Sequence, residues 1–204
     1  MHIPKPAHGS SELNIAAFLR GEADEHRTAF EATLRGLEGP FTQMAQIWER
    51  CIRNDGRILL FGNGGSAADC QHIAAEFVIR YKNNRPAIGA IALTTDTSAL
   101  TACGNDLGFN EIFARQIEAL ARPGDVAVGF STSGKSPNVL AALREARKRE
   151  VHTTGFTGAG GGEMAPLCDV LLSVPSSVTA RIQEMHIYVA HMLCKALEIR
   201  LGHD

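Results

Sequence analysis

A histidine and a glutamate lie four residues apart in the segment GNGGSAADCQHIAAEF, residues 62–77. On a helix, His72 and Glu76 would stack on one face, whereas Cys70, Ile73 and Phe77 would form a separate apolar face. Such a pair can supply two ligands to a divalent metal, or a general base with an acid beside it. The same spacing also occurs in ordinary surface pairs of helices, so this pair needs a partner from elsewhere in the chain.

The last predicted helix, within residues 176–201, offers that partner because it has two apolar faces. Gln183 and His191 lie on the second face, where a polar group without a partner is costly. They are candidate ligands, although nearby backbone could equally satisfy both side chains. Spacing leaves Glu184 open as well, because it lies close to His191 around the helix. A helix that buries two faces in a small protein is often shared with another subunit.

A second stretch that could do chemistry is STSGKSPN, residues 131–138, directly after a predicted strand. Ser131, Thr132, Ser133 and Ser136 offer hydroxyls, and Pro137 fits the first position of the following helix. Free backbone N–H groups and the positive end of a helix make such a loop a good phosphate cradle. The alternative is an ordinary strand-to-helix turn in which hydroxyls cap the helix.

The glycines of the first segment also match a dinucleotide fingerprint, Gly62-x-Gly64-x-x-Ala67. That fingerprint expects an acidic residue at the end of the second strand, about 20 residues on, whereas Asp96 follows about 30 residues after the glycines. A separate hydroxyl-rich loop is also not required by a pyrophosphate on the first helix. The pattern therefore favours a phosphorylated substrate over a dinucleotide.

Short apolar runs alternate with amphipathic segments and predict strands at residues 57–61, 87–93, 125–130, 151–156 and 170–175. Runs that are apolar on both faces are typical of a parallel sheet covered by helices on both sides, so we expect a three-layer, doubly wound α/β fold. Separate helices are predicted before the sheet at residues 11–19, 25–37 and 41–52, and a long helix after it. Ser66 followed by Asp69 predicts a capping-box start for the helix after the first strand. Both loops then lie beyond the carboxyl ends of strands, where such sheets bind ligands.

The composition favours one soluble domain. A chain of 204 residues with 45% apolar content can bury a sizeable core, and a formal charge of -2 provides no basic field for nucleic acid. The start does not resemble a leader and no apolar run reaches membrane-spanning length, so we expect a cytoplasmic protein. Scattered cysteines without a C-x-x-C pair predict free, buried thiols rather than disulfides or a thiolate metal site.

Four motifs in this order, GNGGSAADCQHIAAEF, GND, STSGKSPN and ARIQEMHIYVAH, resemble those of the phosphoheptose isomerases of the sugar isomerase (SIS) fold. The resemblance runs from Phe41 to Leu201, and residues up to Arg20 form an unmatched extension. It implies a single flavodoxin-like SIS domain over residues 1–204, with a helical segment for oligomerisation at 1–56 and the sheet-and-helix core at 57–204. It also implies a cytoplasmic homotetramer that binds a sugar phosphate and neither nucleic acid nor a membrane.

The resemblance also implies the site residues. One zinc ion per subunit would be held by His72, Glu76, Gln183 and His191, so the choice of Gln183 over Glu184 comes from the family. The phosphate would be bound by Ser131, Thr132, Ser133 and Ser136. The sugar would be contacted by Asn63, Gly64, Gly65, Glu76, Asn105, Asp106 and Gln183. The implied reaction converts sedoheptulose 7-phosphate into D-glycero-D-manno-heptose 7-phosphate, the first step toward the heptose of bacterial lipopolysaccharide or capsule.

Exchange between a ketose and an aldose moves one proton between adjacent carbons and one between their oxygens, through a cis-enediol. Glu76 is the expected base at carbon, and His191, whose ordinary pKa is near neutral, is the expected proton donor and acceptor at oxygen. A metal there would polarise the carbonyl. The family also contains non-enzymatic tetramers that bind the replication initiator protein. Those relatives lose the carboxylate and the second histidine, and because this chain keeps both, the enzyme is favoured over the adaptor.

Overall fold

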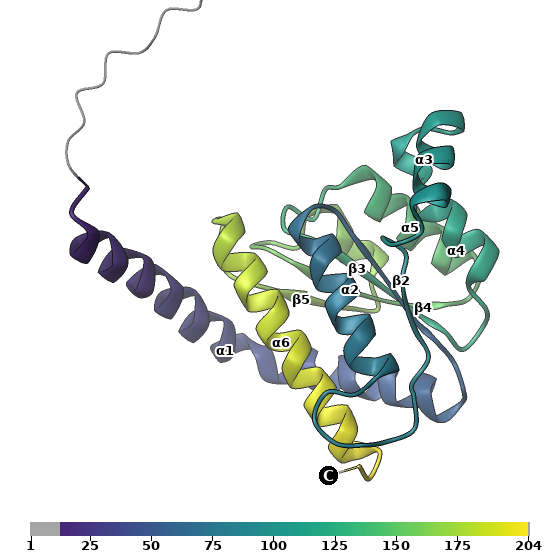
Figure 1. Ribbon diagram of the computed structural model, residues 1–204, viewed down its shortest axis with the longest axis horizontal. Coiled ribbons are helices and arrows are strands. Elements are labelled where there is room, and N and C mark those ends of the chain that lie inside the picture. The colour runs from purple at the N-terminus through teal and green to yellow at the C-terminus, as the bar shows by residue number, and fades with distance from the viewer. Residues whose placement is uncertain (1–12, 204) are drawn as a thin grey trace, which may run out of the picture.

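The computed structural model describes residues 13–203, which form an all-parallel five-stranded sheet with helices on both faces (Figure 1). The strands are β1 (Ile58–Gly62), β2 (Ala90–Ala92), β3 (Val126–Ser131), β4 (His152–Thr157) and β5 (Val170–Ser173), in the order β2-β1-β3-β4-β5. In the centre of the sheet, Leu60 of β1 lies opposite Ala92 of β2 and Val128 of β3. The predicted three-layer, doubly wound fold and its five strands are confirmed.

Side chains of the central strands point alternately into two apolar cores. Ile58 and Leu60 pack on the side of α1 (Ile15–Arg53), α2 (Gly65–Val78) and α6 (Thr179–Arg200). Leu59 and Phe61 pack on the side of α3 (Thr97–Asp106), α4 (Ala114–Leu120) and α5 (Pro137–Lys148). Because neighbouring strand residues face opposite sides of a sheet, strands that are apolar throughout must be covered twice. Two short 3-10 helices, η1 (Phe109–Glu111) and η2 (Gly162–Leu167), complete the connections.

The separate helices predicted before the sheet are a single helix, α1, of 39 residues, so that part of the prediction is wrong. The Gly-Pro step at residues 39 and 40 is a strong breaking signal, because Pro40 has no N–H to donate within a helix. Apolar residues on both sides of Pro40, from Leu37 to Met44 and Trp48, are buried against the same core. This packing outweighs the local signal. Residues 11 and 12 of the first predicted helix lie outside the described part of the chain.

The predicted capping box at the start of α2 is also wrong. The helix is capped by Gly64, whose φ of 57° is accessible to glycine at little cost, and it begins at Gly65. Ser66 is therefore already inside the helix, where it is buried instead of capping it. Asp69 does not return to the cap either. One of its carboxylate oxygens is buried without a hydrogen-bond partner in the described chain, and burial raises its pKa to about 6 against the opposing effect of nearby His72.

The five cysteines are free thiols, as predicted; four are buried, and Cys168 is partly exposed. Burial raises the pKa of Cys51 and of Cys168 to about 12, which keeps both protonated and unreactive. Among the helices of residues 13–203, none combines the length and the apolar content that crossing a bilayer requires.

The strand order reverses beside β1. The chain runs from β1 to β2 on one side of it and then crosses over to β3 on the other side. Open α/β sheets bind ligands at the carboxyl ends of their strands, where the order reverses in this way. The loop after β1 leads into α2, and the loop after β3 leads into α5. The fold therefore brings the two chemistry-bearing loops of the sequence to one edge of the sheet.

Candidate active site

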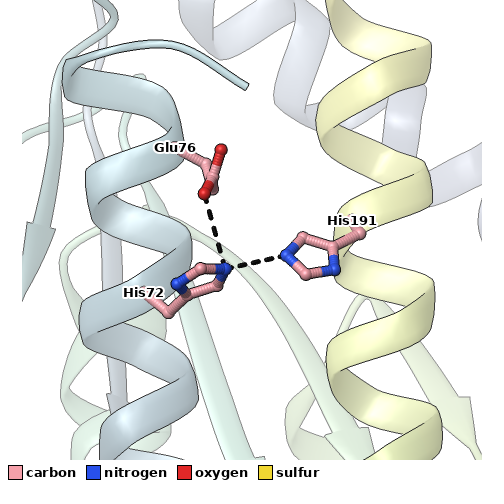
Figure 2. Close-up of side chains that lie close together, drawn as sticks. All are labelled: His72, Glu76 and His191. Carbon is pink, nitrogen blue, oxygen red and sulfur yellow. Dashed lines mark hydrogen bonds and ion pairs between the residues drawn. The ribbon is translucent and has the colours of Figure 1, made fainter. Parts of the chain in front are cut away.

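His72, Glu76 and His191 converge between α2 and α6, which lie side by side (Figures 1 and 2). His72 Nε2 lies 2.8 Å from His191 Nε2 and 3.4 Å from Glu76 Oε1. The two residues of α2 are one helical turn apart and share a face, as their spacing predicts. The partner that this pair needs is supplied by His191, 119 residues further along the chain.

The surroundings of His191 favour its neutral form. Burial lowers its pKa, nearby His72 lowers it further, and Glu76 opposes both effects. The ring of His72 meets the His191 ring edge-on at a centroid distance of 5.0 Å. The Tyr81 ring packs against the His191 ring at a centroid distance of 5.6 Å. A neutral imidazole can accept a proton and then pass it on, which suits a group that moves a proton between two oxygens.

The same three side chains fit a divalent metal. Their ligand atoms all lie within 4.8 Å of one another. Two imidazole nitrogens and one carboxylate form a donor set that zinc accepts, and two nitrogen ligands of a tetrahedral zinc ion are roughly 3.3 Å apart. The 2.8 Å between His72 Nε2 and His191 Nε2 differs from that value by about half an ångström. A small rotation of either ring would bridge the difference.

Gln183 and Glu184, the open alternatives on α6, have different surroundings. Gln183 packs against the start of α2, where a Cβ on Gly65 would lie 2.6 Å from its amide nitrogen. Glycine at position 65 therefore allows this approach. The Glu184 carboxylate bonds to His26 of α1 at 2.7 Å and to Arg181 at 2.8 Å. Its bonding capacity is used in joining α6 to α1, away from the histidine pair.

The loop after β3 gathers its hydroxyls in one place. Ser131 Oγ lies 2.8 Å from Ser136 Oγ and 3.4 Å from Ser133 Oγ. Ser136 precedes α5 but makes no side-chain bond to its N-terminus, and Pro137 occupies the first turn as predicted. The start of the 12-residue helix is thus not closed by a side-chain cap at Ser136, which argues against the ordinary capped turn and favours an anion.

Two further features shape this loop. Gly134 has a φ of 65°, and a Cβ there would lie 2.4 Å from the Gly161 carbonyl oxygen, so only glycine fits. Beside it, Thr132 and Ser133 line a hollow of about 230 Å³ together with residues that precede and begin α6. The loop after β3 and the N-terminal part of α6 therefore face the same space.

The loops after β1 and β3 are joined by a pair of amides. Asn63 Nδ2 donates to Asn138 Oδ1 at 2.9 Å, and Asn138 Nδ2 donates back to Asn63 Oδ1 at 2.8 Å. Asn138 is 1% exposed, so the pair is anchored in the core. Asn63 and Gly64 also line a cavity of about 490 Å³ at the end of β1. This cavity extends the site toward α3.

Asn105 and Asp106 end α3 and are exposed. Their side chains bond to each other, with the Asn105 amide donating to Asp106 Oδ1 at 2.7 Å. Asp106 also lines a separate cavity of about 490 Å³ between α3 and α4, together with Arg115. The described contacts of this pair do not link it to the group formed by His72, Glu76 and His191.

The sequence did not predict that Tyr81 packs against His191 or that Asn138 pairs with Asn63. Tyr81 lies in the irregular segment after α2, where no periodicity marks it. Asn138 is the last residue of the STSGKSPN motif, but a buried amide partner across the sheet has no sequence signal.

The carboxylate that a dinucleotide would need is used elsewhere. Asp96 caps α3 by accepting the Ala99 N–H at 2.9 Å. In the fingerprint the corresponding acid must be free to bind a ribose. This bonding supports the phosphorylated-substrate interpretation.

Comparison with known proteins identifies the family. A family model described as the SIS domain matches residues 23–158. The chain is 55% identical, over 91% of its length and 97% of the relative's, to the phosphoheptose isomerase of Paramagnetospirillum magneticum. It is 58% identical over 96% of its length, and 97% of the relative's, to that of Bradyrhizobium sp..

Solved structures give the same result. The phosphoheptose isomerase of Neisseria gonorrhoeae superimposes with a TM-score of 0.86 at 44% identity, covering 91% of this chain and 100% of that one. The enzyme of Francisella tularensis superimposes with a TM-score of 0.88 at 33% identity, covering 92% and 100%. The chain therefore belongs to the phosphoheptose isomerases of the SIS-domain family, and it is a sugar phosphate isomerase that interconverts an aldose and a ketose.

Proposed function

We propose that the enzyme converts sedoheptulose 7-phosphate into D-glycero-D-manno-heptose 7-phosphate. The observation that carries the proposal is the convergence of Glu76 and His191, from two helices far apart in sequence, around His72. The relatives named phosphoheptose isomerase support the choice of a seven-carbon substrate. Two acid/base groups in one place are what the exchange of a carbonyl between adjacent carbons requires.

The proton transfers can be assigned to these two side chains. Glu76 takes a proton from C1 of the ketose, which places negative charge on the oxygen at C2. His191 then takes the proton from the hydroxyl at C1 and gives it to the oxygen at C2, by way of the cis-enediol, and Glu76 returns its proton to C2, which leaves the aldehyde. Each group ends in its starting state. Burial and nearby His72 lower the pKa of His191, which favours the neutral imidazole that begins and ends this cycle.

His72, Glu76 and His191, with Gln183 as a fourth ligand, would hold one zinc ion per subunit. When bound, zinc would polarise the substrate carbonyl and stabilise negative charge on its oxygen. The convergence of two imidazoles and a carboxylate supports this assignment. Glu76 has a second carboxylate oxygen, which remains for proton transfer at carbon.

The hydroxyl loop would bind the phosphate group. Ser131, Thr132, Ser133 and Ser136 supply donors beside the open N-terminus of α5. Asn63, Gly64 and Gly65 lie on the next loop and would contact the sugar between the phosphate and the metal. Glu76 and Gln183 would contact it as well.

The active form would be a homotetramer. The N-terminal part of α1 extends away from the sheet (Figure 1) and exposes Ile15, Phe18 and Leu19, which are 58%, 47% and 60% accessible. An exposed apolar row of this kind on a helix favours burial against further copies of the chain. Asn105 and Asp106, which lie apart from the histidine pair here, would contact the sugar in this assembly.

The product would supply heptose for bacterial lipopolysaccharide or capsule, and the enzyme would act in the cytoplasm, where phosphorylated sugars are made and used. The relatives named phosphoheptose isomerase support the heptose product.

The test is turnover of sedoheptulose 7-phosphate by purified, metal-analysed protein, with aldose formation followed by NMR. We expect activity that a chelator removes and zinc restores. Activity that survives complete removal of the metal would contradict its role in polarising the carbonyl. Absence of turnover with every divalent metal would contradict the substrate assignment.

A further inference from the structure

Glu198 of α6 and Arg85 form an ion pair in the interior, apart from the candidate metal ligands. Arg85 Nε donates to Glu198 Oε1 at 3.1 Å, and the two side chains are 1% and 2% exposed. A buried ion pair contributes little net stability, because both charges lose their hydration. Its presence therefore needs an explanation other than stability.

The arginine end of the pair holds the last turn of α2. Arg85 Nη2 donates to the Glu76 carbonyl at 2.7 Å, and Nη1 donates to the Phe77 carbonyl at 2.8 Å. Carbonyls in the last turn of a helix have no partner within the helix, and a cation there also complements the helix dipole. Arg85 thus fixes the backbone of the residue whose carboxylate belongs to the active site.

The glutamate end holds the segment after α2. Glu198 Oε1 accepts the Tyr81 N–H at 3.1 Å, and its two oxygens accept the Lys82 N–H at 3.4 and 3.3 Å. The Tyr81 ring lies against the His191 ring at a centroid distance of 5.6 Å. Since Glu198 follows His191 by two turns on α6, one carboxylate ties the helix of His191 to the segment that supports the His191 ring.

We propose that Glu198 and Arg85 are positioning residues that hold α2 and α6 at the separation at which His72, Glu76 and His191 bind one metal ion. The inference rests on the proposed metal site. The pair fixes the Glu76 backbone through Arg85 and the Tyr81 backbone through Glu198, so both halves of the site are set by one buried contact. Loss of the pair leaves the three ligand side chains unchanged but no longer fixes the distance between the two helices.

The chain contains a matched control, Asp125, whose bonds involve neither α2 nor α6. The Asp125 side chain is 3% exposed and accepts two backbone N–H groups, from Arg57 at 2.8 Å and Arg122 at 2.9 Å. It also accepts from the Arg57 guanidinium at 3.0 Å. This is the bonding pattern of Glu198, but its partners are Arg57 and Arg122, which lie before β1 and before β3 and belong to neither helix of the site.

The experiment compares Glu198→Gln with Asp125→Asn in the full-length protein. The zinc dissociation constant is measured by competition with a chromophoric chelator, and thermal unfolding is measured without metal. Both variants are expected to unfold at lower temperature. Glu198→Gln leaves the buried Arg85 guanidinium unpaired, and Asp125→Asn replaces one of the two carboxylate oxygens that accept backbone N–H groups by an amide donor. Only Glu198→Gln should weaken zinc binding, by about 10- to 100-fold, the usual effect of losing a group that orients metal ligands. Asp125→Asn should remain within about twofold of the wild type on the same scale.

Arg85→Lys is the second variant, for the case that Glu198→Gln does not fold. A lysine keeps the buried charge paired but cannot reach Glu198 and both carbonyls at once. It should weaken zinc binding by about tenfold or more.

Unchanged zinc affinity in these variants, or an equal loss in Asp125→Asn, would overturn the inference. A wild-type protein that binds no zinc would overturn it together with the metal site. A wild-type protein that binds zinc but does not turn over sedoheptulose 7-phosphate would contradict only the proposed reaction, and the affinities would still decide on the ion pair.

Discussion

The polar residues after β2 and after β3 occupy the same edge of the sheet but use their bonding groups differently. After β2, the Asp96 carboxylate caps the N-terminus of α3 by accepting the Ala99 N–H. After β3, the hydroxyls of Ser131, Ser133 and Ser136 bond mainly to one another. Ser136 does not cap α5, although Asn138 Oδ1 accepts the Val139 N–H in its first turn. The N-cap side chain is thus bonded to its helix after β2, whereas the N-cap hydroxyl after β3 is not.

The difference separates residues that build the fold from residues that are available to a ligand. Polar groups at the carboxyl ends of parallel strands all lie near the usual ligand crevice, so position alone does not distinguish them. Their existing partners do. The same distinction applies on the helices, where Glu184 is bonded to His26 and Arg181 while Glu76 faces the histidine pair.

The strongest test of this distinction is to remove one carboxylate of each kind. Glu76→Gln should lower kcat by roughly a hundredfold to ten-thousandfold, because the amide cannot take a proton from carbon. Glu184→Gln should change kcat by less than about twofold, since that group is outside the proton path. Steady-state assays with sedoheptulose 7-phosphate give both values. Deuterium exchange from solvent at the wild-type rate in Glu76→Gln would remove the base assignment.

A buried imidazole used by the fold should affect stability and not catalysis. His186 is fully buried and bonds to the Thr157 carbonyl oxygen, and burial lowers its pKa to about 4 although that bond opposes the shift. The unfolded chain protonates this imidazole near pH 6.5, whereas the folded chain does so only near pH 4. Stability from this group is therefore complete above pH 6.5 and is lost as the pH falls to 4, by about 3 kcal/mol.

Urea unfolding at several pH values measures that loss. In His186→Met the overall stability will differ, but the part of the pH slope between 6.5 and 4 that belongs to His186 should disappear. An identical slope in the two proteins would show that other groups cause the acid sensitivity.

Closing the open helix should impair phosphate binding. Ser136→Asp introduces a carboxylate that caps α5 well but repels the phosphate, so KM should rise about tenfold or more while thermal stability is kept or increased. Ser136→Asn caps about as well without the charge. If both variants raise KM equally, occupation of the helix end and not charge is responsible. An unchanged KM in Ser136→Asp would place the phosphate elsewhere.

The smallest effect is expected at the closed helix. Asp96→Ala removes the cap of α3 and should cost about 1 kcal/mol of stability, measured by chemical unfolding. KM and kcat should stay as in the wild type. A rise in KM would mean that Asp96 serves a ligand as well as the helix.

Most of the fold was predictable because the five strands are continuous apolar runs and the helices between them are amphipathic. The errors came where a local signal competed with packing. The Gly-Pro step in α1 favours a break, yet buried side chains on both sides of Pro40 keep one helix. At the start of α2, Ser66 and Asp69 have the spacing of a capping box, but Gly64 takes the cap position.

In the candidate site, spacing made His72, Glu76 and His191 candidates, because the first two share a helix face and His191 lies on an apolar face of α6. Spacing left Glu184 open as well, and the ligand set came from the resemblance to the family. Tyr81 and Arg85 could not be found in this way, since they lie in an irregular segment whose course depends on Glu198. Glu198 itself carries a usable signal. It continues the face of His191 and Cys194 by one turn, and a charge on a buried helix face requires a buried partner.

The reciprocal amide pair of Asn63 and Asn138 bears on the chemical ageing of the protein. Asn63 precedes Gly64, and in an Asn-Gly step the following backbone nitrogen readily attacks the side-chain carboxamide and expels ammonia. In the folded chain both ends of the Asn63 amide are held by Asn138, which withholds the rotation that this attack needs. Conversion of Asn63 to aspartate would replace the Nδ2 donor by a carboxylate oxygen that faces Asn138 Oδ1. The two acceptors would repel each other, which would weaken the contact between the two loops. The rate at which Asn63 deamidates should therefore depend on how often this part of the chain unfolds.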